Sequence, residues 1–150
     1  MVDSLVCVDF DDVELYPLSK AECHLGEGVL HRAFSVFLLD PSGTRVLLQQ
    51  RAAPKLLWPG FWSNSCCSHP RWQEPMESAV QRRLAEELGV NAPVRQLYSF
   101  IYHAQFEDVG AERELCHVFL DARIQRRASR PGGNCCGPVG KQGRYRSGRG

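Results

Sequence analysis

Two side chains suited to chemistry, the thiol of Cys67 and the imidazole of His69, lie two residues apart in this sequence. They belong to the segment 64–70 (NSCCSHP), which follows the aromatic run 58–62 (WPGFW). A thiol can donate a proton and an imidazole can bind a metal ion, and groups of this kind gather at functional sites. The segment therefore predicts an active-site loop rather than an ordinary core loop.

A second group of candidates consists of histidines and glutamates that suit a metal ion. Glu112 and Glu114 alternate along a predicted strand, and residues i and i+2 of a strand point to the same face. Three imidazoles with two carboxylates suit Zn²⁺, Mn²⁺ or Mg²⁺ in a five- or six-coordinate site. The candidate ligands are His24, His31, His69, Glu112 and Glu114. Any one of these histidines taken alone is more often an ordinary surface or core residue, and His103 and His117 are interpreted in that way.

A helix is predicted from about Pro75 to Leu88. Proline suits a first helical position, and Gly89 suits the residue just past the end. Val80, Leu84 and Leu88 recur every four residues and mark the buried face.

The charged residues of this helix approximate the diphosphate-handling pattern of Nudix hydrolases. The matching positions are Glu74, Arg82, Leu84, Glu86 and Glu87. Arg83 stands where those hydrolases carry a glutamate of the hydrolytic metal cluster, and Ser68 replaces their opening glycine. Arginine pairs with phosphate oxygens, and a carboxylate at Glu87 suits Mg²⁺. The pattern favours binding a diphosphate over hydrolysing it. The alternative is a solvated Glu/Arg helix surface.

The rest of residues 1–122 alternates strand and turn signals, which predicts an α/β (α+β) fold with a mixed β-sheet. Strands are expected at 6–8, 31–39, 46–50, 97–104 and 115–122. A turn at 40–43 predicts a hairpin over 31–50. Residues 52–73 form a long loop, and loops of that length in a compact domain are usually functional.

The charge of the chain changes sign near Arg123. Residues 123–150 hold eight Lys or Arg and no Asp or Glu, whereas residues 1–122 hold 10 basic and 17 acidic residues. The sequence therefore predicts a domain over 1–122 and a basic, disordered Gly/Arg-rich tail over 123–150. A nucleic-acid-binding tail is one alternative. The preferred hypothesis is a shifted reading frame or an aberrant splice.

The sequence also predicts a cytoplasmic protein. No apolar run approaches the length of a membrane span, and the N-terminus lacks a signal-peptide pattern. Seven cysteines with two adjacent pairs make a poor disulfide framework, so reduced thiols are expected, buried at Cys7, Cys23 and Cys116. Neither pair has the spacing of a zinc finger.

Together these blocks resemble the type I isopentenyl-diphosphate isomerases, a family with the Nudix fold. The resemblance rests on segment 64–70, the helix after it, the two upstream histidines, and Tyr102 with Glu112-x-Glu114, and it covers about residues 4–122. It implies a mixed sheet sandwiched with helices and the interconversion of isopentenyl and dimethylallyl diphosphate in isoprenoid biosynthesis. Family members add further elements and a closing tryptophan. The resemblance therefore implies a domain that is incomplete at its C-terminus, with impaired stability and activity.

Residue roles follow from the resemblance by position. It implies Cys67, Glu114 and Tyr102 as catalytic residues. It implies one Mn²⁺, Zn²⁺ or Mg²⁺ on His24, His31, His69, Glu112 and Glu114, and a diphosphate-bound Mg²⁺ on Glu87. The implied diphosphate-binding cations are Lys20, Arg51, Lys55 and Arg83.

The residue types suit this chemistry. Protonating an alkene forms a tertiary carbocation, which requires an acid on one face and a base on the other. The ring of Trp62 or Tyr102 can stabilise that cation. The expected partner is a small prenyl diphosphate, with no membrane and no nucleic acid, and the chain is expected to be a monomer or weak homodimer. The alternatives are a Nudix pyrophosphohydrolase and an inactive truncated form whose basic tail binds nucleic acid.

Overall fold

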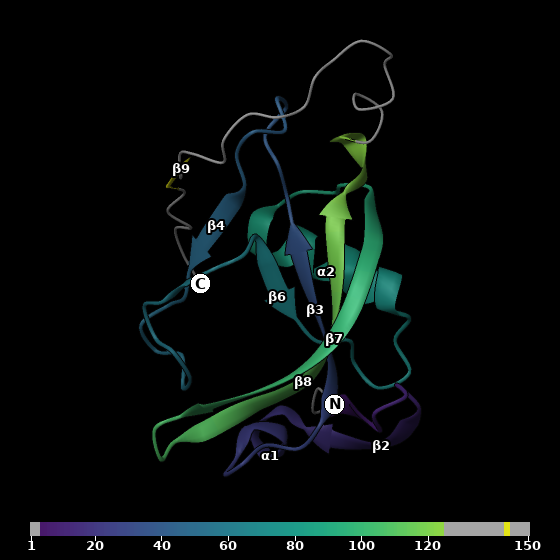
Figure 1. Ribbon diagram of the computed structural model, residues 1–150, viewed down its shortest axis with the longest axis vertical. Coiled ribbons are helices and arrows are strands. Elements are labelled where there is room, and N and C mark those ends of the chain that lie inside the picture. Colours follow the sequence, from purple (N-terminus) through teal and green to yellow (C-terminus); the bar gives the residue numbers. More distant parts are fainter. Residues whose placement is uncertain (1–3, 125–142, 145–150) are drawn as a thin grey trace.

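The computed structural model describes residues 4–124 and 143–144, which contain one large mixed β-sheet, a small sheet and two α-helices (Figure 1). In the large sheet the strand order is β2-β1-β3-β8-β7, and β6 also pairs with β3. These strands are β1 (Ser4–Val8), β2 (Glu14–Ser19), β3 (His31–Phe37), β6 (Cys66–Ser68), β7 (Val94–Phe106) and β8 (Gly110–Asp121). The β3–β8 pair is parallel and the other pairs are antiparallel. The predicted α+β class with a mixed sheet is confirmed.

The remaining elements are short apart from one helix. They are α1 (Lys20–His24), β4 (Leu47–Gln50), β5 (Trp62–Ser63), α2 (Met76–Leu88), the 3₁₀ helix η1 (Ala122–Ile124) and β9 (Gly143–Arg144). The small sheet has the order β5-β4-β9. Within the described ranges, both α-helices are too short and too polar to cross a membrane.

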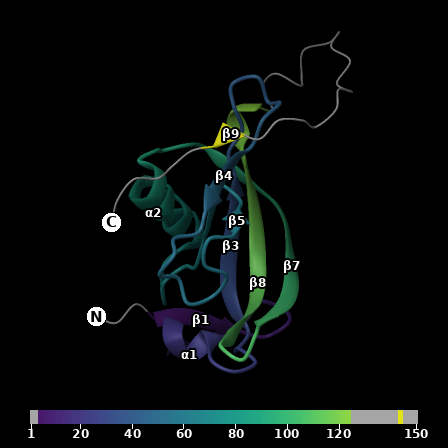
Figure 2. The ribbon, with the colours of Figure 1, turned by 90° about the vertical axis from the view of Figure 1, so that its left-hand side faces the viewer.

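The main core lies between α2 and one face of the large sheet. Figure 2 shows α2 to one side of that sheet. Phe34 and Val36 of β3 pack with Val80 and Leu84 of α2, and all four are almost fully buried. Because side chains alternate along a strand, residues such as Ser35 point to the opposite face of β3. That opposite face is therefore free to build a site.

The ends of α2 agree closely with the prediction. The helix begins at Met76, so Pro75 is the N-cap rather than the first helical residue. Gly89 adopts the left-handed conformation, with φ of 65°, and its N–H bonds the Ala85 carbonyl. Glycine adopts this conformation with little strain, which explains where the helix stops.

Two elements near the N-terminus were not predicted. Strand β2 is mostly exposed and carries Pro17, so it lacks the usual strand signature. Helix α1 spans five residues and begins with a capping box, in which Ser19 and Glu22 bond each other's backbone N–H groups. The Ser-x-x-Glu spacing is the signal in the sequence that marks this helix start.

The predicted hairpin over 31–50 is wrong beyond its turn. The Leu47 N–H bonds the Leu38 carbonyl at 2.9 Å, but the reciprocal bond is replaced by a buried serine. The Ser65 hydroxyl accepts from the Leu38 N–H at 2.7 Å and donates to the Leu47 carbonyl at 2.7 Å. This wedge separates the two strands, so β4 pairs with β5 while β6 pairs with β3. The predicted loop 52–73 accordingly contains both β5 and β6.

We expect Ser65→Ala to lower the free energy of unfolding by about 1–3 kcal/mol, because it leaves the Leu38 N–H and the Leu47 carbonyl unpaired. Urea titrations followed by fluorescence measure the change. The matched control is Ser99→Ala at an exposed position of β7, where the change should stay within about 0.5 kcal/mol. Equal stabilities of the two variants would show that the two hydrogen bonds of the Ser65 hydroxyl do not stabilise the fold.

Other strand predictions hold with adjusted ends, and the tail is largely undescribed. The strands predicted at 97–104 and 115–122 are longer in the structure and form the β7–β8 hairpin. The predicted disorder of 123–150 falls outside the described residues, apart from 123–124 and the two residues of β9, which pair with β4. The division into a domain and a tail stays a prediction.

Candidate active site

A cavity of about 590 Å³ opens on the face of the sheet opposite the main core. Its walls come from α1, β3, β6, β7, β8, the segment 51–64 and the C-terminal half of α2. The predicted site residues that line it are Lys20, His24, Arg51, Lys55, Cys67, His69, Arg83, Glu87, Tyr102, Glu112 and Glu114. The remaining one, His31, is fully buried beside the ring of His69. Residues from six separate elements thus meet in one place.

Four of these residues converge as a candidate metal site. The ligand atoms of His24, His31, His69 and Glu114 all lie within 4.8 Å of one another. The Oε1 atom of Glu114 is 2.9 Å from His69 Nε2, 3.6 Å from His31 Nε2 and 3.9 Å from His24 Nε2.

The protonation of two histidines suits a metal ion. His24 Nδ1 lies 2.7 Å from the Lys20 carbonyl, and His31 Nδ1 lies 2.7 Å from the Val29 carbonyl. A carbonyl only accepts, so each Nδ1 carries the proton and each Nε2 presents a lone pair toward Glu114. Among the described residues, His31 Nε2 has no hydrogen-bond partner although it is buried. This arrangement is typical of metal-binding histidines.

The electrostatics of the cluster agree with that assignment. Burial lowers the pKa of His69 to about 4 and also lowers the pKa of His24. Burial opposes ionisation of Glu114, but the 2.9 Å hydrogen bond with His69 and the nearby imidazole of His31 hold its pKa well below the usual value. Neutral imidazoles and an ionised carboxylate are the forms that bind metals, so these residues fit a divalent ion.

Glu112 lies next to this cluster rather than within it. The Tyr102 hydroxyl is 2.7 Å from a Glu114 oxygen and 2.9 Å from a Glu112 oxygen. Burial and the negative charge of Glu114 raise the pKa of Glu112. A phenol has one proton to donate, so a protonated Glu112 is needed for both contacts to be hydrogen bonds. A role for Glu112 as a metal ligand stays a prediction.

The four predicted diphosphate-binding cations lie on the wall of the same cavity. They are Lys20, Arg51, Lys55 and Arg83. Burial lowers the pKa of Lys20, and the positive charges of Lys55, Arg83 and Arg51 lower it further. Positive charges crowded in this way repel one another, and a bound polyanion would relieve that repulsion.

The thiol of Cys67 faces the same cavity. Strand β6 places Cys67 opposite Ser35 of β3, and its S–H donates to the Asn64 side-chain oxygen. The Ser63 and Ser35 hydroxyls lie 3.4 and 3.6 Å from the sulfur. Desolvation by the cavity walls raises the pKa of Cys67, against the opposing effect of these two hydroxyls. The group is therefore a protonated thiol near neutral pH.

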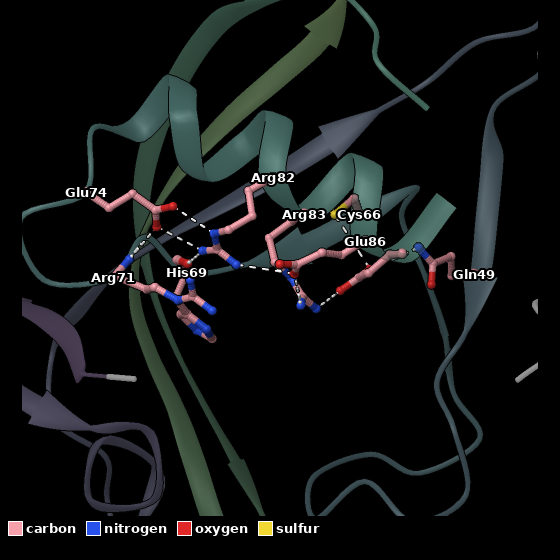
Figure 3. Close-up of polar contacts among 9 residues, drawn as sticks. Gln49, Cys66, His69, Arg71, Glu74, Arg82, Arg83 and Glu86 are labelled. Carbon is pink, nitrogen blue, oxygen red and sulfur yellow. Dashed lines mark hydrogen bonds and ion pairs between the residues drawn. The ribbon is translucent and has the colours of Figure 1, made fainter. Parts of the chain in front are cut away.

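Salt bridges and hydrogen bonds hold the C-terminal end of segment 64–70 against α2 (Figure 3). Two nitrogens of Arg82 donate to Glu74 at 2.7 and 2.9 Å, and one of them also reaches the His69 carbonyl at 3.5 Å. Glu74 in turn accepts from the Arg71 N–H at 2.9 Å. These contacts fix the backbone that carries His69.

A second set of contacts, made by residues of α2, β4 and β6, holds Glu87 at the cavity wall. Arg83 bonds Glu86 at 2.8 Å and also forms a close ion pair with Glu87. Gln49 donates to Glu87 at 3.2 Å, and the Cys66 thiol lies 3.6 Å from the same carboxylate. The predicted helix face shared by Arg83 and Glu87 is confirmed. Its role in binding Mg²⁺ stays a prediction.

We expect Glu74→Gln to lower the free energy of unfolding at pH 7 by about 1–3 kcal/mol, because the variant loses a charged partner of Arg82. Hydrogen bonds from Arg82 hold the pKa of Glu74 below its usual 4.5. A lowered carboxyl pKa stabilises the fold above the usual value, and this contribution is lost as the pH falls through the lowered one. The gap between wild type and variant should therefore shrink below pH 4.5.

Urea titrations across that pH range test this expectation. The control is Glu77→Gln, at an exposed carboxylate in the first turn of α2. If the difference in free energy of unfolding between wild type and Glu74→Gln stayed constant to the lowest pH, the loss of stability would not come from the ionisation of Glu74.

Three residues near the chemistry were missed or misplaced by the sequence interpretation. Phe100 and Cys116 line the cavity. Phe100 lies two residues from Tyr102 and Cys116 two residues from Glu114, so strand alternation places each on the same face as a predicted site residue. This alternation could have predicted both from the sequence. Trp62, considered as a partner for the carbocation, is 48% exposed, and the aromatic residues on the cavity wall are Phe100 and Tyr102.

Comparison with known proteins places these features in a family. The sequence profile of the NUDIX domain matches residues 29–135. The chain is 49% identical over 121 residues to "Isopentenyl-diphosphate Delta-isomerase 1" of Photorhabdus laumondii, covering 79% of this chain and 68% of that protein. It is 46% identical over 120 residues to "Isopentenyl-diphosphate Delta-isomerase" of Serratia proteamaculans, covering 80% of this chain and 66% of that protein. The chain thus spans about two thirds of the length of these relatives.

A solved structure supports the fold independently. The crystal structure of DR0079 from Deinococcus radiodurans aligns with a TM-score of 0.61 at 22% identity, covering 79% of this chain and 70% of that one. At this identity the likeness speaks for the fold alone. With the family profile and the sequence relatives, it leads to one assignment: the chain belongs to the Nudix family and, within it, to the isopentenyl-diphosphate Delta-isomerases.

Proposed function

We propose that this chain converts isopentenyl diphosphate to dimethylallyl diphosphate by a 1,3-allylic proton transfer. The observation that carries the proposal is that one cavity holds a protonated thiol, an ionised carboxylate and a cluster of cations. The cations suit the diphosphate, and the other two groups suit the addition and removal of one proton. The two relatives compared above are both called isopentenyl-diphosphate Delta-isomerases.

The protonation states support distinct roles for the two catalytic groups. Cys67 holds a proton, so it acts as the acid that adds H⁺ to the terminal CH₂ of the alkene. This step forms the tertiary carbocation and leaves a thiolate. Glu114 is ionised, so it acts as the base that removes a proton from the carbon next to the cation. The double bond then lies one position nearer the diphosphate.

The aromatic residues of β7 complete the hydrocarbon side of the site. Tyr102 and Phe100 line the cavity, and their rings are stacked with centroids 5.6 Å apart. The face of an aromatic ring attracts a cation, and an enclosed site keeps water from trapping it as an alcohol. The Tyr102 hydroxyl also orients the Glu114 carboxylate through its 2.7 Å hydrogen bond.

Two metal sites belong to this proposal. The first site would hold one Mn²⁺, Zn²⁺ or Mg²⁺ on His24, His31, His69 and Glu114, with Glu112 beside them. Its positive charge would keep Glu114 ionised. Glu87 would hold a Mg²⁺ that enters with the diphosphate, next to Lys20, Arg51, Lys55 and Arg83.

The sequence-based expectations on context stay predictions. They are a cytoplasmic location, a monomer or weak homodimer, and an origin of the 123–150 segment in a shifted reading frame. The hydrolase alternative gains no support from the site. Arg83 occupies the position of a hydrolytic glutamate and forms ion pairs with Glu86 and Glu87.

The proposal is tested by incubating the purified chain with isopentenyl diphosphate, Mg²⁺ and Mn²⁺ in D₂O. We expect ¹H NMR to show dimethylallyl diphosphate with deuterium in the methyl group formed from the terminal CH₂, with no release of inorganic phosphate. Phosphate or pyrophosphate release without deuterium incorporation would instead indicate a hydrolase. Absence of both would refute the isomerase proposal for this chain.

A further inference from the structure

The hydroxyl of Ser35 lies between two thiols on the cavity wall. Its Oγ atom is 3.6 Å from the sulfur of Cys67 and 3.4 Å from the sulfur of Cys116. Ser35 comes from β3, Cys67 from the neighbouring β6 and Cys116 from the neighbouring β8. All three side chains line the cavity. Neither Ser35 nor Cys116 has a role in the chemistry described above.

The protons available on these thiols and hydroxyls determine which group donates each hydrogen bond. The Cys116 S–H donates to the Ser35 oxygen, so the Ser35 O–H remains free to donate elsewhere. The single proton of Cys67 goes to Asn64, and the hydroxyl proton of Ser63 also goes to Asn64, at 3.3 Å. Each thiol or hydroxyl has one proton to donate. The Ser35 hydroxyl is therefore the donor left for the sulfur of Cys67.

The backbone of Ser35 is also the more rigidly held of the two hydroxyl-bearing neighbours. Strand β3 is hydrogen-bonded on one side to β6 and on the other to β8. Ser63 instead belongs to the two-residue strand β5 of the small sheet. A contact from the centre of a sheet fixes a partner more firmly than one from a short outer strand.

We propose that Ser35 is a positioning residue that holds the thiol of Cys67 in one orientation, with Cys116 fixing the direction of the Ser35 hydroxyl. This inference rests on the proposed function in one respect, namely that the alkene of the substrate is the group that the thiol faces. The orientation of the thiol is itself a property of these three residues and Asn64.

The first measurement reads that orientation directly and needs no substrate. Cysteine labelled with ¹³C and ¹⁵N allows the χ1 angle of Cys67 to be followed by NMR scalar couplings. We expect one staggered rotamer in the wild type, rotamer averaging in Ser35→Ala, and one rotamer again in Ser35→Thr, which keeps a hydroxyl. The control, Ser99→Ala on β7, should match the wild type. A single unchanged rotamer in Ser35→Ala would overturn the proposal.

Cys116 supplies a second pair of variants should Ser35→Ala not fold. Cys116→Ser keeps a donor to the Ser35 oxygen, whereas Cys116→Ala removes it. Averaging of Cys67 χ1 in the alanine variant alone supports the proposal. Identical rotamers in both variants contradict the role given to Cys116.

Kinetics then connect the orientation to turnover. We expect Ser35→Ala to lower kcat by about 10- to 100-fold with KM nearly unchanged, because a misaimed group slows the chemical step without weakening diphosphate binding. Ser35→Thr should restore most of kcat. A rise in KM at constant kcat would place Ser35 in substrate binding and overturn the proposal. A wild type without isomerase turnover would refute the proposed function, while the rotamer measurement would still decide this inference.

Discussion

Cys67→Ala is expected to lower kcat for isopentenyl diphosphate by about 10²- to 10⁴-fold, because it removes the group that protonates the alkene. The variant retains the four cations and the His/Glu cluster, so binding of the diphosphate and of Mn²⁺ should stay close to wild type. Deuterium incorporation followed by NMR measures the loss of proton transfer. Calorimetry with inorganic diphosphate and Mn²⁺ measures the binding that is retained.

The control for this prediction is Cys7→Ala. Cys7 is a buried thiol that packs with Leu5 and Cys23, away from the cavity lining. Its replacement should leave kcat near the wild-type value. Comparable turnover in Cys67→Ala and Cys7→Ala would remove the thiol from the mechanism.

Glu114→Gln is expected to have two large effects because Glu114 serves two functions. Its Oε1 atom contacts three imidazoles, and its Oε2 atom accepts from Tyr102. Loss of the charge should weaken Mn²⁺ binding by at least about 100-fold, since changing even an outer-shell partner of a metal ligand costs 10- to 100-fold. Loss of the base should also lower kcat by about 10²- to 10⁴-fold.

Calorimetric titration with Mn²⁺ and the turnover assay separate these two effects. The control is Glu107→Gln, an exposed carboxylate in the turn between β7 and β8. Wild-type metal affinity in Glu114→Gln would show that the cluster binds no ion through this residue. Wild-type turnover would exclude Glu114 as the base.

Much of the site was readable from the sequence because its residues have distinctive types. Cys67, the three histidines and the Glu-x-Glu pair are uncommon in these combinations, and the structure brings all of them to one cavity or its wall. Their roles came from a resemblance to a family, because spacing along the chain alone cannot show that His24 and Glu114 meet. Phe100 and Cys116 were missed since aromatic and thiol side chains in a strand resemble ordinary core residues.

The sequence predicted the fold correctly where neighbouring residues determine the structure, and wrongly where a side chain distant in the sequence determines it. The apolar repeat of α2 and the glycine after it gave a helix within one residue of the observed bounds. The hairpin over 31–50 failed because Ser65, far along the chain, replaces one of its backbone hydrogen bonds. Competition of this kind between a local turn and a remote hydroxyl leaves no trace in a window of neighbouring residues.

The parallel β3–β8 pair has a consequence for how the protein reaches its native state. It aligns His31 with Glu114, two residues that lie far apart in the sequence. Contacts between remote segments form slowly, because the chain between them must first lose much of its freedom. The cluster around Glu114 can assemble only after this long-range pairing has formed. During refolding, the appearance of tight Mn²⁺ binding should mark the end of the process rather than its beginning.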